Sequence, residues 1–218
     1  MQRANVFITG GTGYMGRRLI PALVTRGHSI QAFVRRGSES RVPSDAEAIA
    51  GDVLSRDSLA AAIPAGSVVV HLVGTPRPSP KKASQFETLD FVSARECIAA
   101  AKTAGARHFV YVSVAHPSPI MQAYIGVRVR VEALLEESGI PHTIIRPWYV
   151  LGPGHRWPYV LVPMYWLLSV LPATRDGARR LGLVTLAEMI GTLTWAVESA
   201  ETESRIVDVP EIRRRGKP

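Results

Sequence analysis

Residues 9–16, with the sequence TGGTGYMG, constrain the fold more than any other part of the chain. They follow the apolar run at residues 6–8, which predicts a short buried strand. They also open the segment 14–26, whose apolar residues recur at helical spacing. Backbone N–H groups and the positive end of the helix dipole then face any anion held at the turn. The alternative is a plain tight turn whose glycines serve only helix packing.

Each glycine of this turn has a physical role in binding a dinucleotide. Gly10 lets the chain reverse off the strand, Gly13 lets the backbone approach a pyrophosphate, and Gly16 lets the helix pack on the sheet. A glycine triplet alone is a weak signal, but the order of strand, turn and helix strengthens it. The residues expected around the phosphates are Gly10, Thr12, Gly13, Tyr14, Met15 and Gly16.

Composition places the chain among folded globular proteins. Its 218 residues are 46% hydrophobic and 20% charged, which suits one α/β domain with a sizeable core. The formal net charge of +8 favours anionic ligands. The basic residues are scattered, however, and no zinc-finger or RNA-recognition signature accompanies them, so we predict neither a specific nucleic-acid partner nor a metal site.

Three further features bear on location. The single cysteine, Cys97, cannot form an internal disulfide, and its apolar helical surroundings predict a buried thiol. A lone cysteine favours a reducing, cytoplasmic location. The first residues lead directly into a strand, so we expect no signal peptide. The most lipid-like segment, residues 157–171, is shorter than the roughly 20 residues that span a bilayer. No transmembrane segment is therefore predicted.

Short apolar runs alternate with helical segments along the chain, which predicts an α/β fold with a Rossmann-like, doubly wound parallel sheet. The predicted strands cover residues 6–8, 29–34, 47–53, 67–73, 108–113 and 205–209. The predicted helices cover residues 14–26, 55–63, 86–104, 124–139 and 186–198.

The second predicted strand ends in Arg35 and Arg36, about 20 residues after the glycine turn. In dinucleotide-binding folds an acidic residue at this position accepts from the 2′-hydroxyl of the adenosine ribose, whereas arginine accommodates a 2′-phosphate. No carboxylate stands here. The sequence therefore favours NADP(H) over NAD(H), unless both arginines are merely solvated.

Two later strand ends complete the predicted cofactor site. Asp52 can accept a hydrogen bond from the adenine amine while Val53 packs beside the ring; equally, Asp52 can cap the turn into the next helix. The fourth strand is nearly continuous in apolar residues, which is typical of a strand covered on both faces. It ends at Val73, before Gly74 and Thr75, where a small residue leaves room for a cofactor.

The second half of the chain adds Tyr124 and Arg128 on a predicted helix, then Arg146-Pro147 and the Gly-Pro-Gly at residues 152–154. Together with the glycine turn and Gly-Asp-Val at residues 51–53, this order resembles the atypical or extended branch of the short-chain dehydrogenase/reductase superfamily. That branch holds NAD(P)-dependent sugar epimerase, flavonoid reductase-like and NmrA-like proteins. The resemblance implies a cofactor contact at Pro147. It also implies one domain over residues 1–218, with residues 152–218 forming a small substrate-side elaboration.

Catalytic members of that superfamily use a tyrosine as proton donor, a lysine four residues later and a nearby serine or threonine. A phenol with a pKa of about 10 exchanges a proton at neutral pH only if a neighbouring cation lowers that pKa. A hydroxyl then holds the substrate oxygen. The resemblance implies that Tyr124 is the donor, Arg128 takes the lysine's place and Ser113 is the hydroxyl, all three also contacting the cofactor.

Arg128 departs from the family pattern. Arginine can bind ribose hydroxyls and supply charge, but it is forked and effectively never deprotonated, which disfavours a proton relay through it. Ser118 and His116 are alternative candidates for the hydroxyl and the acid, and Tyr124 can equally be a partly buried helix aromatic.

Two functions therefore stay open. One is an NADP(H)-dependent oxidoreductase or epimerase-like enzyme that acts on an unidentified small carbonyl or alcohol substrate. The other is a non-catalytic dinucleotide-binding redox sensor or assembly subunit.

The C-terminal part carries the most aromatic stretch, within residues 157–171. It fits a lid over the substrate pocket, a homo-oligomer interface, or a contact with a membrane surface. The polar residues around it fit either an anionic substrate or a solvated rim. They are His155, Arg156, Arg175, Asp176, Arg179 and Arg180.

Overall fold

A computed structural model of the chain describes residues 3–153, 160, 181–200 and 203–216. The predictions for His155, Arg156, the aromatic stretch other than Val160, and the polar residues at 175–180 lie outside these described residues. The expectations of a lid, an interface and a membrane-surface contact therefore stay predictions.

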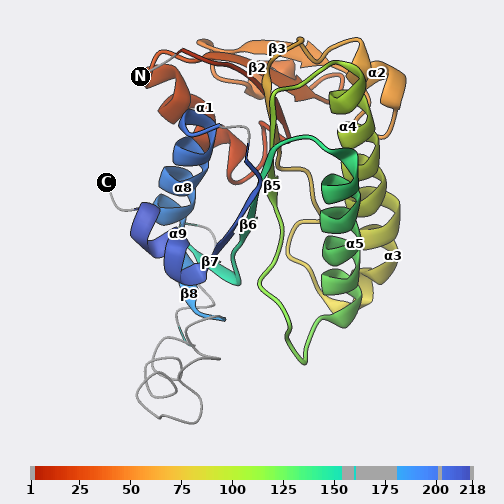
Figure 1. Ribbon diagram of the computed structural model, residues 1–218, viewed down its shortest axis with the longest axis vertical. Coiled ribbons are helices and arrows are strands. Elements are labelled where there is room, and N and C mark those ends of the chain that lie inside the picture. The colour runs from red at the N-terminus through yellow and green to blue at the C-terminus, as the bar shows by residue number, and fades with distance from the viewer. Residues whose placement is uncertain (1–2, 154–159, 161–180, 201–202, 217–218) are drawn as a thin grey trace.

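The described residues form a seven-stranded, all-parallel sheet in the order β3-β2-β1-β4-β5-β6-β9 (Figure 1). The strands are β1 (Asn5–Thr9), β2 (Ser29–Val34), β3 (Glu47–Ala50), β4 (Val68–His71), β5 (His108–Val112), β6 (His142–Arg146) and β9 (Arg205–Asp208). The strand order reverses between β1 and β4, and ligands of open α/β sheets bind at the carboxyl edge of such a switch point. The predicted doubly wound α/β fold is confirmed.

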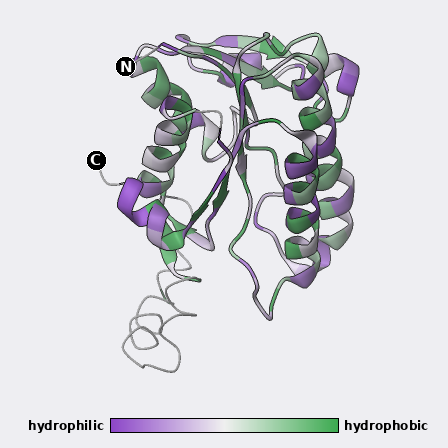
Figure 2. Cartoon of the chain, in the orientation of Figure 1, coloured by the Kyte–Doolittle hydropathy of each residue, from purple (hydrophilic) through white to green (hydrophobic). Residues whose placement is uncertain are grey.

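Helices cover both faces of the sheet (Figure 1). One face carries α1 (Gly16–Thr25), α8 (Leu186–Glu198) and α9 (Val209–Arg215), and the other carries α2 (Arg56–Ala60), α4 (Val92–Thr103) and α5 (Gln122–Ser138). Figure 2 shows hydrophilic and hydrophobic residues mixed along each flanking helix, as amphipathic helices require.

Each face of the sheet has its own apolar core. Val68 and Val70 of β4 join the cluster with Leu19 and Leu193, whereas Val69 joins the cluster on the opposite face. Successive side chains of a strand point to opposite faces, so the three valines of β4 are buried on both faces, and only its last residue, His71, is polar. This explains the continuous apolar run in the sequence.

The helix predicted at residues 86–104 is wrong in its details. The chain first forms α3 (Ala83–Gln85), then a π-helical segment, η3 (Phe86–Phe91), and only then α4. Phe86 and Asp90, the buried residues of η3, are four positions apart, which is also the spacing of one face of an α-helix. Periodicity therefore could not reveal the wider turn. Two short 3-10 helices, η1 (Glu39–Arg41) and η2 (Pro80–Lys82), complete the connections.

The C-terminal elements are divided between two sheets. β7 (Tyr149–Leu151) and β8 (Leu183–Thr185) form a separate two-stranded parallel sheet, whereas β9 pairs with β6 in the main sheet. The helix α8 was expected at the sheet edge, but it packs beside α1 on one face. Part of the range 152–218 thus belongs to the main layered unit, and the division into a core and a substrate-side elaboration stays a prediction.

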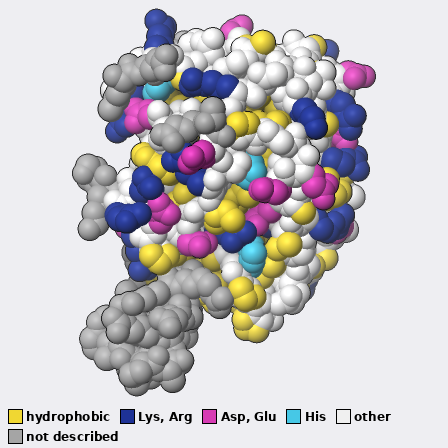
Figure 3. Space-filling view, viewed as in Figure 1, with side chains coloured by type: hydrophobic (Ala, Val, Ile, Leu, Met, Phe, Trp, Pro, Cys, Tyr) yellow, Lys and Arg dark blue, Asp and Glu magenta, His cyan; other side chains and the backbone are white. Residues whose placement is uncertain are grey.

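Other classes of site find no support in the part of the chain that the structure describes. No helix there is long and apolar enough to cross a bilayer, and no group of three or more His, Cys, Asp or Glu side chains is arranged to hold a metal. On the face shown in Figure 3, basic side chains are scattered among acidic ones and form no single patch.

Candidate functional site

The glycine turn lies where β1 meets α1, and its geometry accounts for its glycines. Gly10 has a φ of +75°, in the left-handed region that favours glycine, and its carbonyl accepts from the N–H of Gly13 at 2.9 Å. A Cβ on Gly16 would lie 2.5 Å from the carbonyl oxygen of Gly10 and 2.6 Å from the Cα of Gly11. Backbone atoms cannot rotate away, so Gly16 must be glycine for α1 to begin here.

A cleft runs along this edge of the sheet in two adjoining sections of about 390 and 450 Å³. Both sections are lined by Gly10, Gly13 and Gly74, and their volumes are in the range of small-molecule sites. One section extends to residues that follow β2 and β3, and the other extends to Tyr124 and Arg128 of α5.

Most of the predicted cofactor residues line this cleft. They are Gly10, Thr12, Gly13, Tyr14, Met15, Gly16, Arg35, Val53, Val73, Gly74, Thr75, Tyr124 and Arg128. Four others are found elsewhere. Arg36 is exposed, Ser113 and Pro147 are buried, and the exposed Asp52 accepts a hydrogen bond from the N–H of Leu54 at 2.9 Å. That contact fits the capping alternative for Asp52 and leaves its second oxygen without a described bond.

Arg41 is a lining residue that the sequence did not indicate. It belongs to η1 and lines the same section of the cleft as Arg35, and its Nη2 donates to the hydroxyl of Ser38 at 2.6 Å. A basic residue in a connecting segment has no periodic signal, so only the folded chain brings Arg41 to the same section of the cleft as Arg35.

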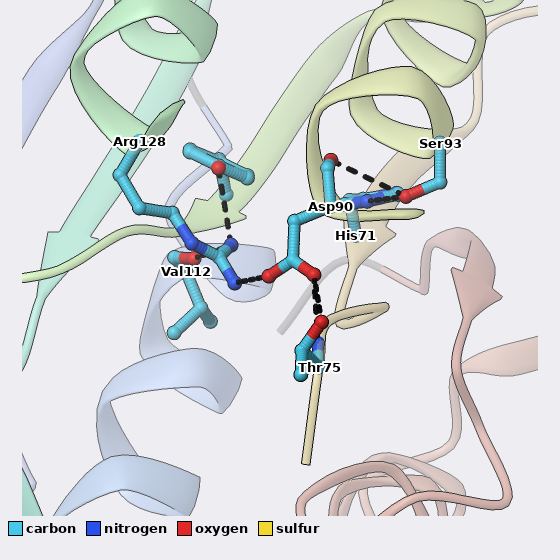
Figure 4. Close-up of polar contacts among 7 residues, drawn as sticks. His71, Thr75, Asp90, Ser93, Val112 and Arg128 are labelled. Carbon is cyan, nitrogen blue, oxygen red and sulfur yellow. Dashed lines mark hydrogen bonds and ion pairs between the residues drawn. The ribbon is translucent and has the colours of Figure 1, made fainter. Parts of the chain in front are cut away.

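Arg128 lines the same section as Arg41 and lies in a buried polar network (Figure 4). Its Nη2 donates to Asp90 Oδ1 at 2.6 Å, and its Nη1 donates to the Tyr111 hydroxyl and to the carbonyl of Val112, both at 3.1 Å. The second Asp90 oxygen accepts from the N–H of Thr75 at 2.8 Å and from its hydroxyl at 2.6 Å. Asp90 was missed by the sequence analysis, since a carboxylate on the inner face of a predicted helix was its only signal.

The electrostatics of this network keep Arg128 charged. Burial alone would lower the pKa of Arg128, but the charge of Asp90 and the hydrogen bond to Tyr111 outweigh burial and raise it. Burial raises the pKa of Tyr111 to about 12 against the opposing effect of Arg128, so the phenol is neutral. Arg128 is thus a permanent cation in a nearly water-free position, with a side chain 6% exposed.

Tyr124 lies one helical turn before Arg128 on α5. The guanidinium carbon of Arg128 is 4.9 Å from the centroid of the Tyr124 ring, which is a cation–π distance. The Tyr124 ring also packs edge-on against Phe86, with ring centroids 5.1 Å apart. Tyr124 is half-buried and lines the cleft, so its ring has a fixed place there.

Ser113 is engaged by a second polar cluster. Its hydroxyl donates to Glu132 Oε1 at 2.5 Å, and both oxygens of Glu132 also accept from Arg146, at 3.1 and 2.5 Å. His116 Nε2 lies 3.3 Å from Oε2 of the same carboxylate. The buried hydroxyl of Ser113 is therefore held by Glu132, and the alternative candidate His116 belongs to the same cluster.

His71, which lies beside the Asp90–Arg128 network, makes the stability of the folded chain depend on pH. Its Nδ1 bonds the Thr9 hydroxyl at 2.9 Å, and burial, followed by the charge of Arg128, lowers the pKa of His71 from 6.5 to about 3. The unfolded chain therefore takes up a proton between these pH values that the folded chain does not. We expect the free energy of unfolding to fall as the pH decreases through this window, by up to about 1.4 kcal/mol per pH unit.

The variant His71→Asn retains a donor and acceptor near Thr9 but cannot titrate. Urea unfolding of both proteins between about pH 4 and 7 should therefore show a shallower loss of stability for the variant. Parallel losses in the two proteins would contradict the assignment to His71.

A family model described as NAD(P)H-binding matches residues 10–160, the part of the chain that begins at the glycine turn and includes Tyr124 and Arg128. The chain belongs to this family. The resemblance to atypical short-chain dehydrogenase/reductase proteins is thereby confirmed, and with it a nicotinamide dinucleotide as the class of cofactor.

Individual relatives of this NAD(P)H-binding chain differ in role. It is 27% identical over 224 residues to the 3-diazoavenalumate denitrifying reductase of Streptomyces, covering 90% of this chain and 73% of the reductase. It is 30% identical over 149 residues to the photosystem II assembly factor Ycf39 of Trieres chinensis, covering 65% of this chain and 44% of that factor. The solved structure of MoeE5 in complex with UDP-glucose and NAD shares the fold, with a TM-score of 0.71, 20% identity and coverage of 95% and 79%.

Proposed function

We propose that the chain binds NADP(H) and acts as an oxidoreductase or epimerase-like enzyme on a carbonyl or alcohol substrate. The observation that carries this proposal is that the glycine turn, Arg35 and the Tyr124–Arg128 pair all line one cleft. The reductase among the relatives supports the same reaction class.

The residues of the cleft fit a dinucleotide. A Cβ on Gly10 would lie 2.9 Å from the carbonyl carbon of Leu72, and one on Gly13 would lie 3.0 Å from the Gly10 oxygen, so the turn has space only for backbone. Its N–H groups and the start of α1 are suited to hold a pyrophosphate. When bound, the nicotinamide would supply or accept the hydride.

Arg35 and Arg41 are suited to hold a 2′-phosphate, and this supports NADP(H) over NAD(H). Both line the cleft and both are exposed, so a phosphate from solvent can reach both guanidinium groups, one of which, that of Arg41, also donates to Ser38. Arginine binds phosphate oxygens through paired charge-assisted hydrogen bonds.

Removing either arginine is expected to weaken NADPH binding by about tenfold and NADH binding by less than about twofold. Titration of Arg35→Ala and Arg41→Ala with both nucleotides, followed by nucleotide fluorescence, measures this difference. Arg107→Ala removes an exposed charge just before β5, at the opposite edge of the sheet, and serves as the matched control. Equal losses for NADPH and NADH would contradict a 2′-phosphate site.

Tyr124 also lines the cleft and is the group available to exchange a proton with a substrate oxygen. Arg128 remains protonated, so it does not relay that proton, and its role is to hold positive charge beside the Tyr124 ring. The proton therefore leaves Tyr124 for the substrate and is replaced from solvent.

A non-catalytic dinucleotide-binding protein is the second candidate function. The observation that favours it is the bond from Ser113 to Glu132, because a serine held in this way does not present its hydroxyl to a substrate carbonyl. The assembly factor among the relatives supports a role in assembly. Turnover by Tyr124 variants separates the two candidates.

A further inference from the structure

The π-helical segment η3 lies against the first turns of α5, and its two buried side chains contact the Tyr124–Arg128 pair. Phe86 packs edge-on against Tyr124, and Asp90 pairs with Arg128. Each pair of residues is four positions apart in its own helix, so the two helices present matching side chains in register. π-Helical turns inside longer helices are frequent at functional sites.

Asp90 connects two residues that line the cleft, Arg128 and Thr75. Its side chain is 0% exposed, and its two oxygens accept from Arg128 on one side and Thr75 on the other. A buried carboxylate is strongly unfavourable unless it is paired and hydrogen-bonded, and Asp90 satisfies both conditions. Thr75 and Arg128 line the cleft, whereas Asp90 does not. Asp90 therefore links two lining residues from outside the cleft.

The position of Arg128 depends on this carboxylate. Its two Nη atoms bond Asp90, Tyr111 and Val112, whereas its buried Nε has no partner among the described residues. A Cβ on Gly74 would lie 2.7 Å from Nη2 of Arg128, so the guanidinium is held against the bare backbone of the cleft wall. Without Asp90 a long, flexible arginine has no charged group to fix it there.

We infer that Asp90 is a positioning residue that holds Arg128 as a fixed cation at the nicotinamide end of the cleft. That end is assigned by elimination, because Gly51 and Val53 line only the section that Arg128 does not reach, and this section suits the adenosine half, whereas Arg35 lines both sections. Asp90 should therefore control affinity for the nicotinamide half of the dinucleotide while leaving the adenosine half unaffected. The inference rests on the proposed function, since it concerns the same cleft.

The test compares NADPH with adenosine 2′,5′-bisphosphate, which lacks the nicotinamide half. Asp90→Asn should weaken NADPH by about tenfold or more and the bisphosphate by less than about twofold. Glu87→Gln is the matched control, because it makes the same chemical change in the same segment, at an exposed carboxylate paired with Arg130. The control should change neither affinity by more than about twofold.

Tyr111→Phe provides a second variant, in case Asp90→Asn does not fold. It removes the hydroxyl that accepts from Arg128 Nη1 without changing any charge. We expect a loss of about threefold in NADPH affinity and no change for the bisphosphate.

Three outcomes decide the inference. Selective loss of NADPH binding supports it, whereas unchanged NADPH affinity, or equal losses for both ligands, overturns it. If the unaltered protein binds neither NADPH nor NADH, the proposed function itself fails. That failure is seen before any variant is measured, so it is distinguishable from the failure of Asp90 as a positioning residue.

Discussion

Replacing Tyr124 by phenylalanine is expected to lower the turnover of a carbonyl substrate by about 10²- to 10⁴-fold, the usual contribution of a positioned proton donor. The affinity for NADPH should change by less than about threefold, because the ring contacts with Phe86 and Arg128 do not involve the hydroxyl. Oxidation of NADPH across a panel of carbonyl and quinone compounds measures turnover.

Tyr149→Phe serves as the control for this experiment, since Tyr149 lies in β7 and packs against Trp148. Unchanged turnover in Tyr124→Phe would show that the tyrosine is not the proton donor. Binding of NADPH with no turnover of any compound by the unaltered protein would instead support the non-catalytic function.

Gly16→Ala is expected to abolish measurable dinucleotide binding and to lower the free energy of unfolding by about 3 kcal/mol or more. The added Cβ would lie 2.5 Å from the Gly10 oxygen and 2.6 Å from the Gly11 Cα, so the turn and the start of α1 must separate. Urea unfolding and NADPH titration measure the two effects.

Gly126→Ala is the matched control, because a Cβ at this exposed position of α5 meets nothing within 4 Å. Alanine favours the helix there, so stability should rise by about 0.5–1 kcal/mol with binding unchanged. A Gly16→Ala variant as stable as the unaltered protein would contradict the steric account of the turn.

The fold was predictable from the sequence wherever local pattern decides structure. Local pattern alone predicts the conformation of three elements, and all three form as expected. They are the apolar run of β4, the glycine turn and α8 with its helical spacing. The pairing of β9 with β6 was not predictable, because strand order depends on contacts between distant segments and not on the apolar pattern of either strand.

The candidate site was predictable only in part, for the same reason. The glycine turn and Arg35 follow strand ends, which the parallel sheet brings to one edge. Asp90 acts on Arg128 across 38 positions of sequence, and Arg41 reaches the cleft from a short 3-10 helix. Neither residue carries a local signal, because its role exists only after folding.

The burial of Cys97 was predictable from the sequence, because apolar residues surround it, and the thiol is buried.

The packing of α8 beside α1 has a consequence for synthesis of the chain. Leu19, Ile20 and Leu23 of α1 share one core cluster with Met189 and Leu193 of α8. The surface ion pair between the same helices, Arg26 with Glu198, spans 172 positions. On the ribosome the glycine turn is therefore made before α8, and one side of α1 stays uncovered until α8 has emerged. The turn that we propose to contact the cofactor thus gains its native support only after α8 has been made.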